Sequence, residues 1–236
     1  MLNLPSSIQE YGMQIRQEER RIMDAVESYF TQIEKRNDDL NIVIQCFNNS
    51  AYKRAESLEK ELREGQDRGP MHGVPIGVKD IFAMTGYLPS AGSGAAISCG
   101  DREATVIKKL EASGAIILGV LNLDEFAAGG TGVNAWFGRC KNPLDEHRIT
   151  GGSSSGSAAA ISAKFSLATI GSDAGGSIRI PAAFCGVCGL KPTYGRVSRF
   201  GAVPRTWSMD CIGPLASNIG DLGIVLEAIS GHDAQD

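Results

Sequence analysis

A glycine- and serine-rich block at residues 151–193 does most to limit what this chain of 236 residues can fold into. Two loops of small residues lie in the block, at 151–157 and 171–177, and each runs directly into a helix-forming segment. A loop that opens a helix leaves backbone N–H groups unpaired, and such groups bind negatively charged oxygen atoms. The block therefore predicts an oxyanion site built from backbone amides.

Short apolar runs after residue 73 predict a buried sheet. These runs lie at residues 74–78, 116–118 and 167–170. Because they show no polar alternation, we expect both faces of the strands to be covered. Helical segments are expected at residues 104–113, 156–164 and 178–184. Together these patterns predict an α/β fold in which helices cover both faces of a mixed sheet.

The first 65 residues differ from the rest of the chain because apolar residues recur there at helical spacing. Two amphipathic helices are expected, with apolar faces formed by Ile22, Val26, Tyr29, Phe30 and Ile33 and by Ala51, Ala55, Leu58 and Leu62. We expect residues 1–65 to pack as a helical segment on a core formed by residues 66–236. A last helix is predicted at 218–230, with Ser217 as its N-cap and Gly231 just past its end.

The composition excludes several classes of function. The chain is 42% hydrophobic and 21% charged, with a formal net charge of −4 and no run rich in lysine or arginine. These values argue against direct binding to nucleic acid or to an anionic membrane. Because neither a secretory signal nor a transmembrane stretch is recognisable, we expect a cytoplasmic protein.

The six cysteines are scattered along the chain, at Cys46, Cys99, Cys140, Cys185, Cys188 and Cys211. Cys185 and Cys188 have the spacing of a metal or redox pair, but neither a second pair nor a histidine cluster completes a zinc site. We therefore expect reduced, packed thiols, and neither a metal nor an organic cofactor.

Lys79 is unusual because it ends a run that indicates a buried strand, and lysine is rarely buried without a reason. Burial disfavours the ammonium form and lowers the pKa, which allows the amine to accept a proton near neutral pH. The alternatives are that Lys79 pairs with Asp80 or extends to the surface.

Ser177 ends the second small-residue loop. There the consecutive amides of Ala174, Gly175, Gly176 and Ser177 can surround one small atom and stabilise the charge of a tetrahedral intermediate. This position suits a nucleophile, and the alternative is a serine that only caps the following helix. A nucleophilic serine also needs a base.

Histidine is a poor candidate for that base. The chain has three histidines, His72, His147 and His232, and none lies beside a serine in a strained strand-to-helix turn. We expect capping or surface positions for His72 and His232 and no Ser-His-Asp site.

Four motifs, in this order along the chain, resemble the amidase signature family. They are Gly77-Val78-Lys79-Asp80, Gly151-Gly152-Ser153-Ser154, Asp173-Ala174-Gly175-Gly176-Ser177-Ile178-Arg179 and Gly189-Leu190-Lys191-Pro192-Thr193. The resemblance covers about residues 22–232. It implies that Ser177 is the nucleophile, that Ser153 is a bridging serine held by a cis peptide bond, and that Lys79 is the base. The separation of 24 residues between the serines also suits the family and selects Ser153 over Ser154.

The resemblance implies a proton relay without a cofactor. Neutral Lys79 takes a proton through Ser153 while Ser177 attacks an amide carbon, and the backbone amides of residues 174–177 receive the oxyanion. Asp173 and Arg179 are expected to hold the two serine loops in register, with Ser154 in a supporting position.

Two departures from the family pattern are visible. Ser155 stands where the family usually has glycine, and it would be strained if its φ were positive. The chain also stops at Asp236, whereas family members are usually much longer. We expect either a fragment or a short protein whose open sheet edge is covered by a second copy or by a partner subunit.

Three functions are compatible with these residues. We favour a general amidase that hydrolyses a small-molecule amide, because residues 203–210 look like those of stand-alone amidases. Residues 194–201 and 231–233 look closer to the amide-hydrolysing subunit of the glutamyl/aspartyl-tRNA amidotransferases, which is the main alternative. The third hypothesis is an inactive scaffold or binding module that retains the serine loops for its fold.

Overall fold

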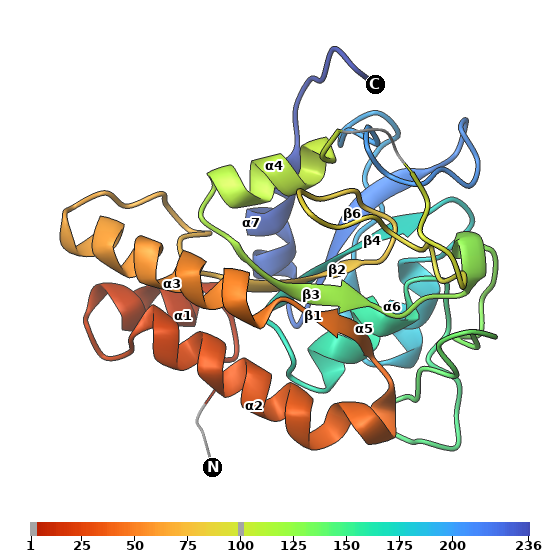
Figure 1. The fold of residues 1–236 in the computed structure, drawn as a ribbon, viewed down its shortest axis with the longest axis horizontal. Helices are drawn as coiled ribbons and strands as arrows, with labels where there is room; N and C mark the ends of the chain where they lie inside the picture. Colours follow the sequence, from red (N-terminus) through yellow and green to blue (C-terminus); the bar gives the residue numbers. More distant parts are fainter. Residues whose placement is uncertain (1–3, 99–101) are drawn as a thin grey trace.

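The computed structural model describes residues 4–98 and 102–236, and in it a six-stranded mixed sheet carries helices on both faces (Figure 1). The strands are β1 (Val43–Cys46), β2 (Pro75–Lys79), β3 (Ile116–Leu121), β4 (Ala168–Asp173), β5 (Cys188–Gly189) and β6 (Cys211–Ala216), in the order β1-β3-β2-β4-β6-β5. β2 pairs in parallel with β3 and β4, and the other pairs are antiparallel. The predicted α/β fold with a mixed sheet is therefore confirmed.

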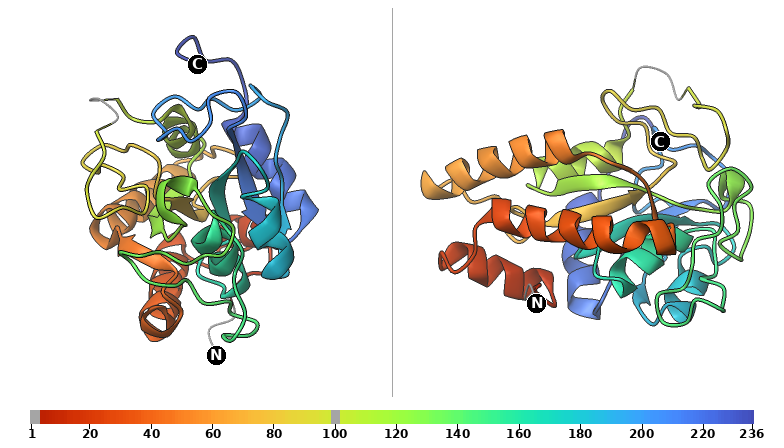
Figure 2. Two further views of the ribbon diagram at one scale, coloured as in Figure 1. Left: turned by 90° about the vertical axis from the view of Figure 1, so that its right-hand side faces the viewer. Right: turned by 60° about the horizontal axis from the view of Figure 1, so that its bottom comes forward.

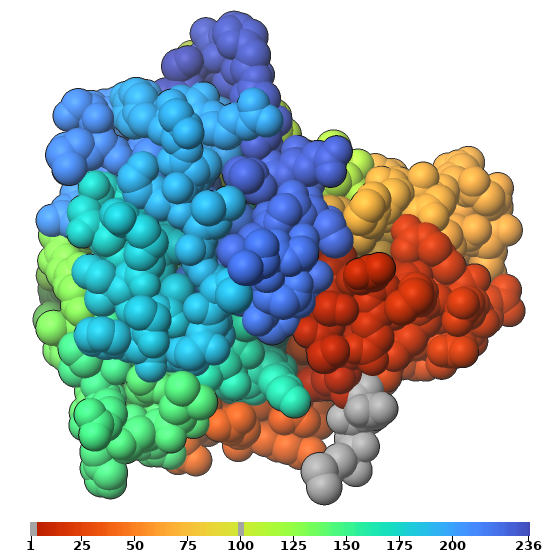
Figure 3. Space-filling model, turned by 180° about the vertical axis from the view of Figure 1, so that it is seen from behind, coloured from red at the N-terminus to blue at the C-terminus, as the bar shows by residue number. Residues whose placement is uncertain are grey.

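The helices are arranged as two layers around this sheet. They are α1 (Ile8–Arg16), α2 (Ile22–Leu40), α3 (Asn48–Arg63), α4 (Thr105–Ala112), α5 (Ser155–Ser162), α6 (Arg179–Phe184) and α7 (Ile219–Ile229), with a 3-10 turn η1 (Glu125–Ala127). α5 lies on one face and contacts the four central strands, while α4 and α7 contact each other on the other face (Figures 1 and 2). Seen from behind, the N-terminal helices in red pack directly beside α7 in blue (Figure 3).

Burial explains why three strands could be located from the sequence. Every residue of β2 and β4 is buried, and five of the six residues of β3 are. These strands coincide with the predicted apolar runs. β6 is equally buried but contains Gly213 and Pro214, which disguise a strand in sequence. β1 has only four residues, one of them exposed, so its pattern is too short to detect.

Two local expectations need correction. The N-cap of α7 is Asn218, whose side chain accepts a hydrogen bond from the Asp221 N–H at 2.9 Å. Ser217 instead donates from its hydroxyl to the Ser6 carbonyl at 2.9 Å, which ties α7 to the segment before α1. Ser155 is the first residue of α5 and does not have a positive φ, so the expected strain is absent.

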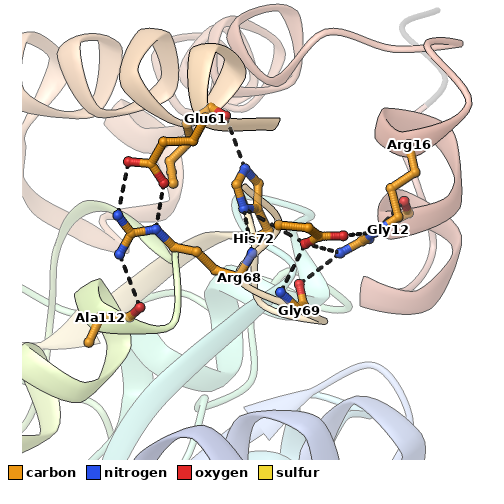
Figure 4. Close-up of polar contacts among 9 residues, drawn as sticks. Gly12, Arg16, Glu61, Arg68, Gly69, His72 and Ala112 are labelled. Carbon is orange, nitrogen blue, oxygen red and sulfur yellow. Dashed lines mark hydrogen bonds and ion pairs between the residues drawn. The ribbon is translucent and has the colours of Figure 1, made fainter. Parts of the chain in front are cut away.

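Polar contacts connect α1 and α3 to the loop before β2 (Figure 4). His72 is completely buried in that loop, and not at a surface or capping position as expected. Its Nδ1 accepts from the Arg68 N–H at 3.1 Å, so its Nε2 carries the proton and donates to the Leu58 carbonyl at 3.0 Å. Arg16 of α1 forms an ion pair with Asp67 at 2.7 Å. These contacts attach both helices to the start of the central strand.

The first 65 residues also supply β1 to the sheet, through its antiparallel pairing with β3. The division of the chain at residue 65 remains a prediction. Within residues 4–98 and 102–236, no helix has the length and apolar character needed to cross a membrane.

Candidate active site

The side chain of Lys79 lies at the carboxyl end of β2 and has no exposed surface. Its Nζ is 2.7 Å from the Ser153 hydroxyl, 3.1 Å from that of Ser154 and 3.0 Å from that of Ser172. The amine therefore sits in a cage of three serine oxygens. It neither extends to the surface nor pairs with Asp80.

Asp80 faces a different set of partners. Its carboxylate accepts hydrogen bonds from the hydroxyls of Tyr87 and Ser90, both in the loop that follows β2. This carboxylate holds that loop in place.

Burial is the main influence on the protonation of Lys79. It lowers the pKa of the amine from 10.5 to about 7, while the negative charges of Asp124 and Asp173 act in the opposite direction. A substantial fraction of the amine is then neutral at pH 7, as a base must be.

The hydrogen bonds of the three hydroxyls identify which serine can pass on a proton. The Ser154 hydroxyl donates to the Ser172 carbonyl at 3.1 Å and accepts from the Ser172 N–H at 3.2 Å. Its proton is therefore already used in a hydrogen bond to the backbone. A neutral amine has two N–H donors and one lone pair. If the two donors of Lys79 serve Ser154 and Ser172, the lone pair faces the hydroxyl proton of Ser153. The geometry thus supports Ser153, not Ser154, as the proton carrier.

The fold brings the two serine loops together at one edge of the sheet. β2 and β4 are parallel, so Lys79 and Ser172 lie at neighbouring carboxyl ends. The Ser154 N–H donates to the Ser177 carbonyl at 3.0 Å and joins the two loops directly. The peptide bond between Gly152 and Ser153 is cis, as the resemblance implied.

Ser177 is 5% exposed and lies two residues before α6, next to the N-cap of that helix. The N-cap of α6 is Ile178, and the helix has no side-chain cap, so the capping alternative for Ser177 is not supported. The Gly176 N–H donates to the Asp173 carboxylate at 2.6 Å. The Gly176 amide, one of the four expected to receive the oxyanion, is therefore engaged by Asp173, and the oxyanion role of residues 174–177 remains a prediction.

Asp173 and Arg179 form the expected ion pair at 2.9 Å. The Asp173 side chain is fully buried, whereas that of Arg179 is 54% exposed. Burial acts to raise the pKa of Asp173, but Arg179 and the backbone N–H groups of residues 176, 178 and 179 outweigh it and hold that pKa below its usual value. The ionised carboxylate thereby fixes the loop in front of α6.

Two residues beside Lys79 were not identified from the sequence. Ser172 was assigned to a loop, but it belongs to β4, and its side chain reaches Lys79. Asp124 follows β3 at the same edge of the sheet and is 3% exposed. The sequence feature that could have identified both residues is their position after an apolar run, because polar residues at the carboxyl ends of parallel strands lie close together.

A surface groove of about 280 Å³ leads toward this cluster. It is lined in part by Arg199, Val203 and Trp207, and these residues also line a smaller hollow that reaches Ser172. The smaller hollow has a volume of only about 20 Å³, and Ser172 is the one partner of Lys79 that lines either space.

The thiols do not form a pair. Cys185 is buried and its Sγ contacts the Thr150 carbonyl at 3.6 Å, while the Sγ of Cys188 faces the Ser217 carbonyl at 3.9 Å. Both are free cysteines in the described ranges, and Cys99 lies outside those ranges.

The α/β fold and the lysine in its serine cage define a class of protein with a Ser-Ser-Lys arrangement. The Amidase family profile matches residues 24–236, and the chain belongs to this family.

Individual relatives agree with this assignment. Two of them are the A subunits of glutamyl-tRNA(Gln) amidotransferase from Chlorobium chlorochromatii and Thermosynechococcus vestitus, each 43% identical over 98% of this chain. The alignments cover 49% and 48% of those proteins. Among solved structures, native peptide amidase from Stenotrophomonas maltophilia superposes with a TM-score of 0.93 at 36% identity, over 98% of this chain and 49% of that one. The chain thus spans about half the length of the curated relatives it matches.

Proposed function

We propose that this chain hydrolyses a carboxylic amide through an acyl-enzyme on Ser177. The observation that carries the proposal is the cage of three serine hydroxyls around the buried Lys79 amine. The family membership supports it.

In the proposed reaction, the lone pair of Lys79 takes the hydroxyl proton of Ser153. Ser153 in turn takes the proton of Ser177, whose oxygen attacks the amide carbon. The amides of Ala174, Gly175 and Ser177 receive the oxyanion, each well-placed donor being worth about 3 kcal/mol. The proton returns through Ser153 to the leaving nitrogen. Water then cleaves the acyl-enzyme, and every step uses groups of this chain.

Ammonia release from glutamine, asparagine and a C-terminally amidated dipeptide tests the proposal. We expect turnover of at least one of these amides, and a loss of at least about 100-fold in kcat for Ser177→Ala. Ser157→Ala is the matched control, because the Ser157 hydroxyl is also buried but donates to the Ile170 carbonyl in α5 packing, away from Lys79. Equal turnover by wild type and Ser177→Ala would contradict the proposal.

A second candidate is the glutaminase reaction of an amidotransferase subunit. It is favoured by the names of eight curated relatives at 41–45% identity, each of which is a glutamyl-tRNA(Gln) amidotransferase A subunit. Selective release of ammonia from glutamine, raised by a partner subunit, would favour this candidate. Turnover of the amidated dipeptide by the chain alone would favour the general amidase.

A further inference from the structure

Asp124 is a buried carboxylate, and no cation of residues 4–98 and 102–236 forms an ion pair with it. Its side chain accepts from the Gly132 N–H at 2.8 Å and from the Thr131 N–H at 3.2 Å, both of which are neutral donors. A buried charge without a paired cation is costly, so its retention at this position requires a reason.

Asp124 lies against the segment that carries Ser153. The Asp124 N–H donates to the Ser153 carbonyl at 3.3 Å, and a Cβ at position 152 would collide with the Asp124 carboxylate oxygen. Because the Ser153 hydroxyl is 2.7 Å from the Lys79 amine, the amine and the Asp124 carboxylate both lie against the segment formed by Gly152 and Ser153. They interact through space without a hydrogen bond.

Other charged groups face Lys79 but are already compensated. Asp173 is paired with Arg179. Asp210, which is only partly buried, accepts from two backbone N–H groups, and the exposed Arg205 beside it opposes its effect on Lys79. Asp80, the next residue along the chain, turns to Tyr87 and Ser90.

We propose that Asp124 is the buried counter-charge of Lys79 and that its carboxylate sets the pH at which the Ser153 relay takes up a proton. Asp124 acts as a positioning residue, since it reaches the reaction only through Lys79. This role rests on the proposed amidase function.

The physical reason is the balance between burial and charge. Burial alone would lower the pKa of the Lys79 amine so far that the amine would be too weak a base to take a proton from Ser177 through Ser153. An unpaired negative charge nearby favours the ammonium form and keeps the amine basic. The influence is mutual: burial raises the pKa of Asp124, while its backbone donors and the charge of Lys79 lower it.

The variant Asp124→Asn tests this role, because asparagine retains an oxygen acceptor for the Gly132 N–H but removes the charge. We expect the acid limb of the kcat/KM profile to move toward lower pH by about one pH unit. Asp124→Glu, which keeps a charge, should leave the limb nearer its original pH. A purely structural role predicts lower activity at every pH with no movement of the limb, and that result would overturn the proposal.

Asp221→Asn is the matched control. Asp221 is also a buried carboxylate held by backbone N–H groups, but it lies at the start of α7, at the opposite end of the sheet from Lys79. We expect this variant to leave the acid limb in place. An equal movement of the limb in Asp221→Asn would overturn the specific role of Asp124.

A direct titration separates this proposal from the proposed function and requires no variant. In wild type carrying ¹³C-labelled lysine and aspartate, the carboxyl carbon of Asp124 should shift at the same midpoint as the ε-carbon of Lys79, because interacting groups titrate together. This titration measures the interaction between Asp124 and Lys79 directly, so it gives a result even if the protein hydrolyses none of the amides tested. An Asp124 signal that stays constant through the Lys79 midpoint would overturn the proposal.

Discussion

Lys79 shows at the residue scale how a fold can change the chemistry of one side chain. In an unfolded chain the amine is hydrated and keeps its ordinary pKa. In the folded chain burial lowers that pKa to about 7, and only three serine hydroxyls replace the lost water. The same burial that creates a base therefore costs stability below the ordinary pKa of lysine, and this cost is largest below about pH 7, where the buried amine must also carry a proton.

This cost gives a prediction about stability and pH. Between about pH 7 and pH 10 the unfolded chain binds more protons at Lys79 than the folded chain does, so the contribution of Lys79 to the free energy of unfolding rises with pH. The free energy of unfolding of wild type, minus that of Lys79→Met, should therefore rise by up to about 1.4 kcal/mol per pH unit across this range. Urea denaturation of both proteins at several pH values measures the difference. A difference that stays constant or falls with pH would contradict the lowered pKa.

The two adjacent serines should respond differently to alanine. Ser153→Ala removes the hydroxyl that faces the lone pair of Lys79, so we expect a loss of at least about 100-fold in kcat with little change in stability. Ser154→Ala breaks the bridge to the Ser172 backbone, so we expect a loss of about 1–3 kcal/mol in stability. Amide turnover and urea denaturation distinguish the two effects. Unimpaired turnover by Ser153→Ala would contradict the assignment of the proton carrier.

Among the elements, those with a strong periodic pattern could be predicted and those with a mixed pattern could not. β2 and β4 were found because the runs 74–78 and 167–170 show no polar alternation, and α7 because its apolar residues repeat at helical spacing. β6 was missed because Pro214 breaks the usual strand composition, although its carbonyl still accepts from the Leu190 N–H in the sheet. β5 has two residues, which is too few for any pattern.

The site was predictable to the extent that it lies in contiguous motifs. Lys79 and Ser153 were identified before their contact was known, because each belongs to a motif of several residues. Ser172 and Asp124 carry no motif of their own, and only the parallel pairing of the strands brings them to Lys79. The use of the Gly176 amide by Asp173 also depends on a loop geometry that composition does not specify.

At the scale of elements, His72 offers a test of how α1 and α3 are attached. His72→Ala removes an acceptor for the partly buried Arg68 N–H and a donor to the buried Leu58 carbonyl, and it leaves a cavity in place of a fully buried ring. We expect a loss of about 2–4 kcal/mol in the free energy of unfolding. His147→Ala, on an exposed loop, should change stability by less than about 0.5 kcal/mol. Equal stabilities of the two variants would contradict the structural role of His72.

At the scale of the whole molecule, a chain about half as long as its relatives brings Lys79 into contact with Ser153 and places the loop of Ser177 beside Ser154. Several large apolar side chains stay exposed around it, among them Trp207 at 70% and Met209 at 50%. The two-residue strand β5 forms one edge of the sheet. We still expect a second copy or a partner subunit to cover this side.

A working serine–lysine relay in this half-length chain is what the proposed function requires above all. Intact-mass analysis after treatment with a serine-directed fluorophosphonate tests it, on wild type and on Ser177→Ala and Lys79→Met variants that circular dichroism shows to be folded. We predict one adduct on wild type, none on Ser177→Ala and slow labelling of Lys79→Met. A folded wild type without an adduct, or equal labelling of all three proteins, would contradict the relay.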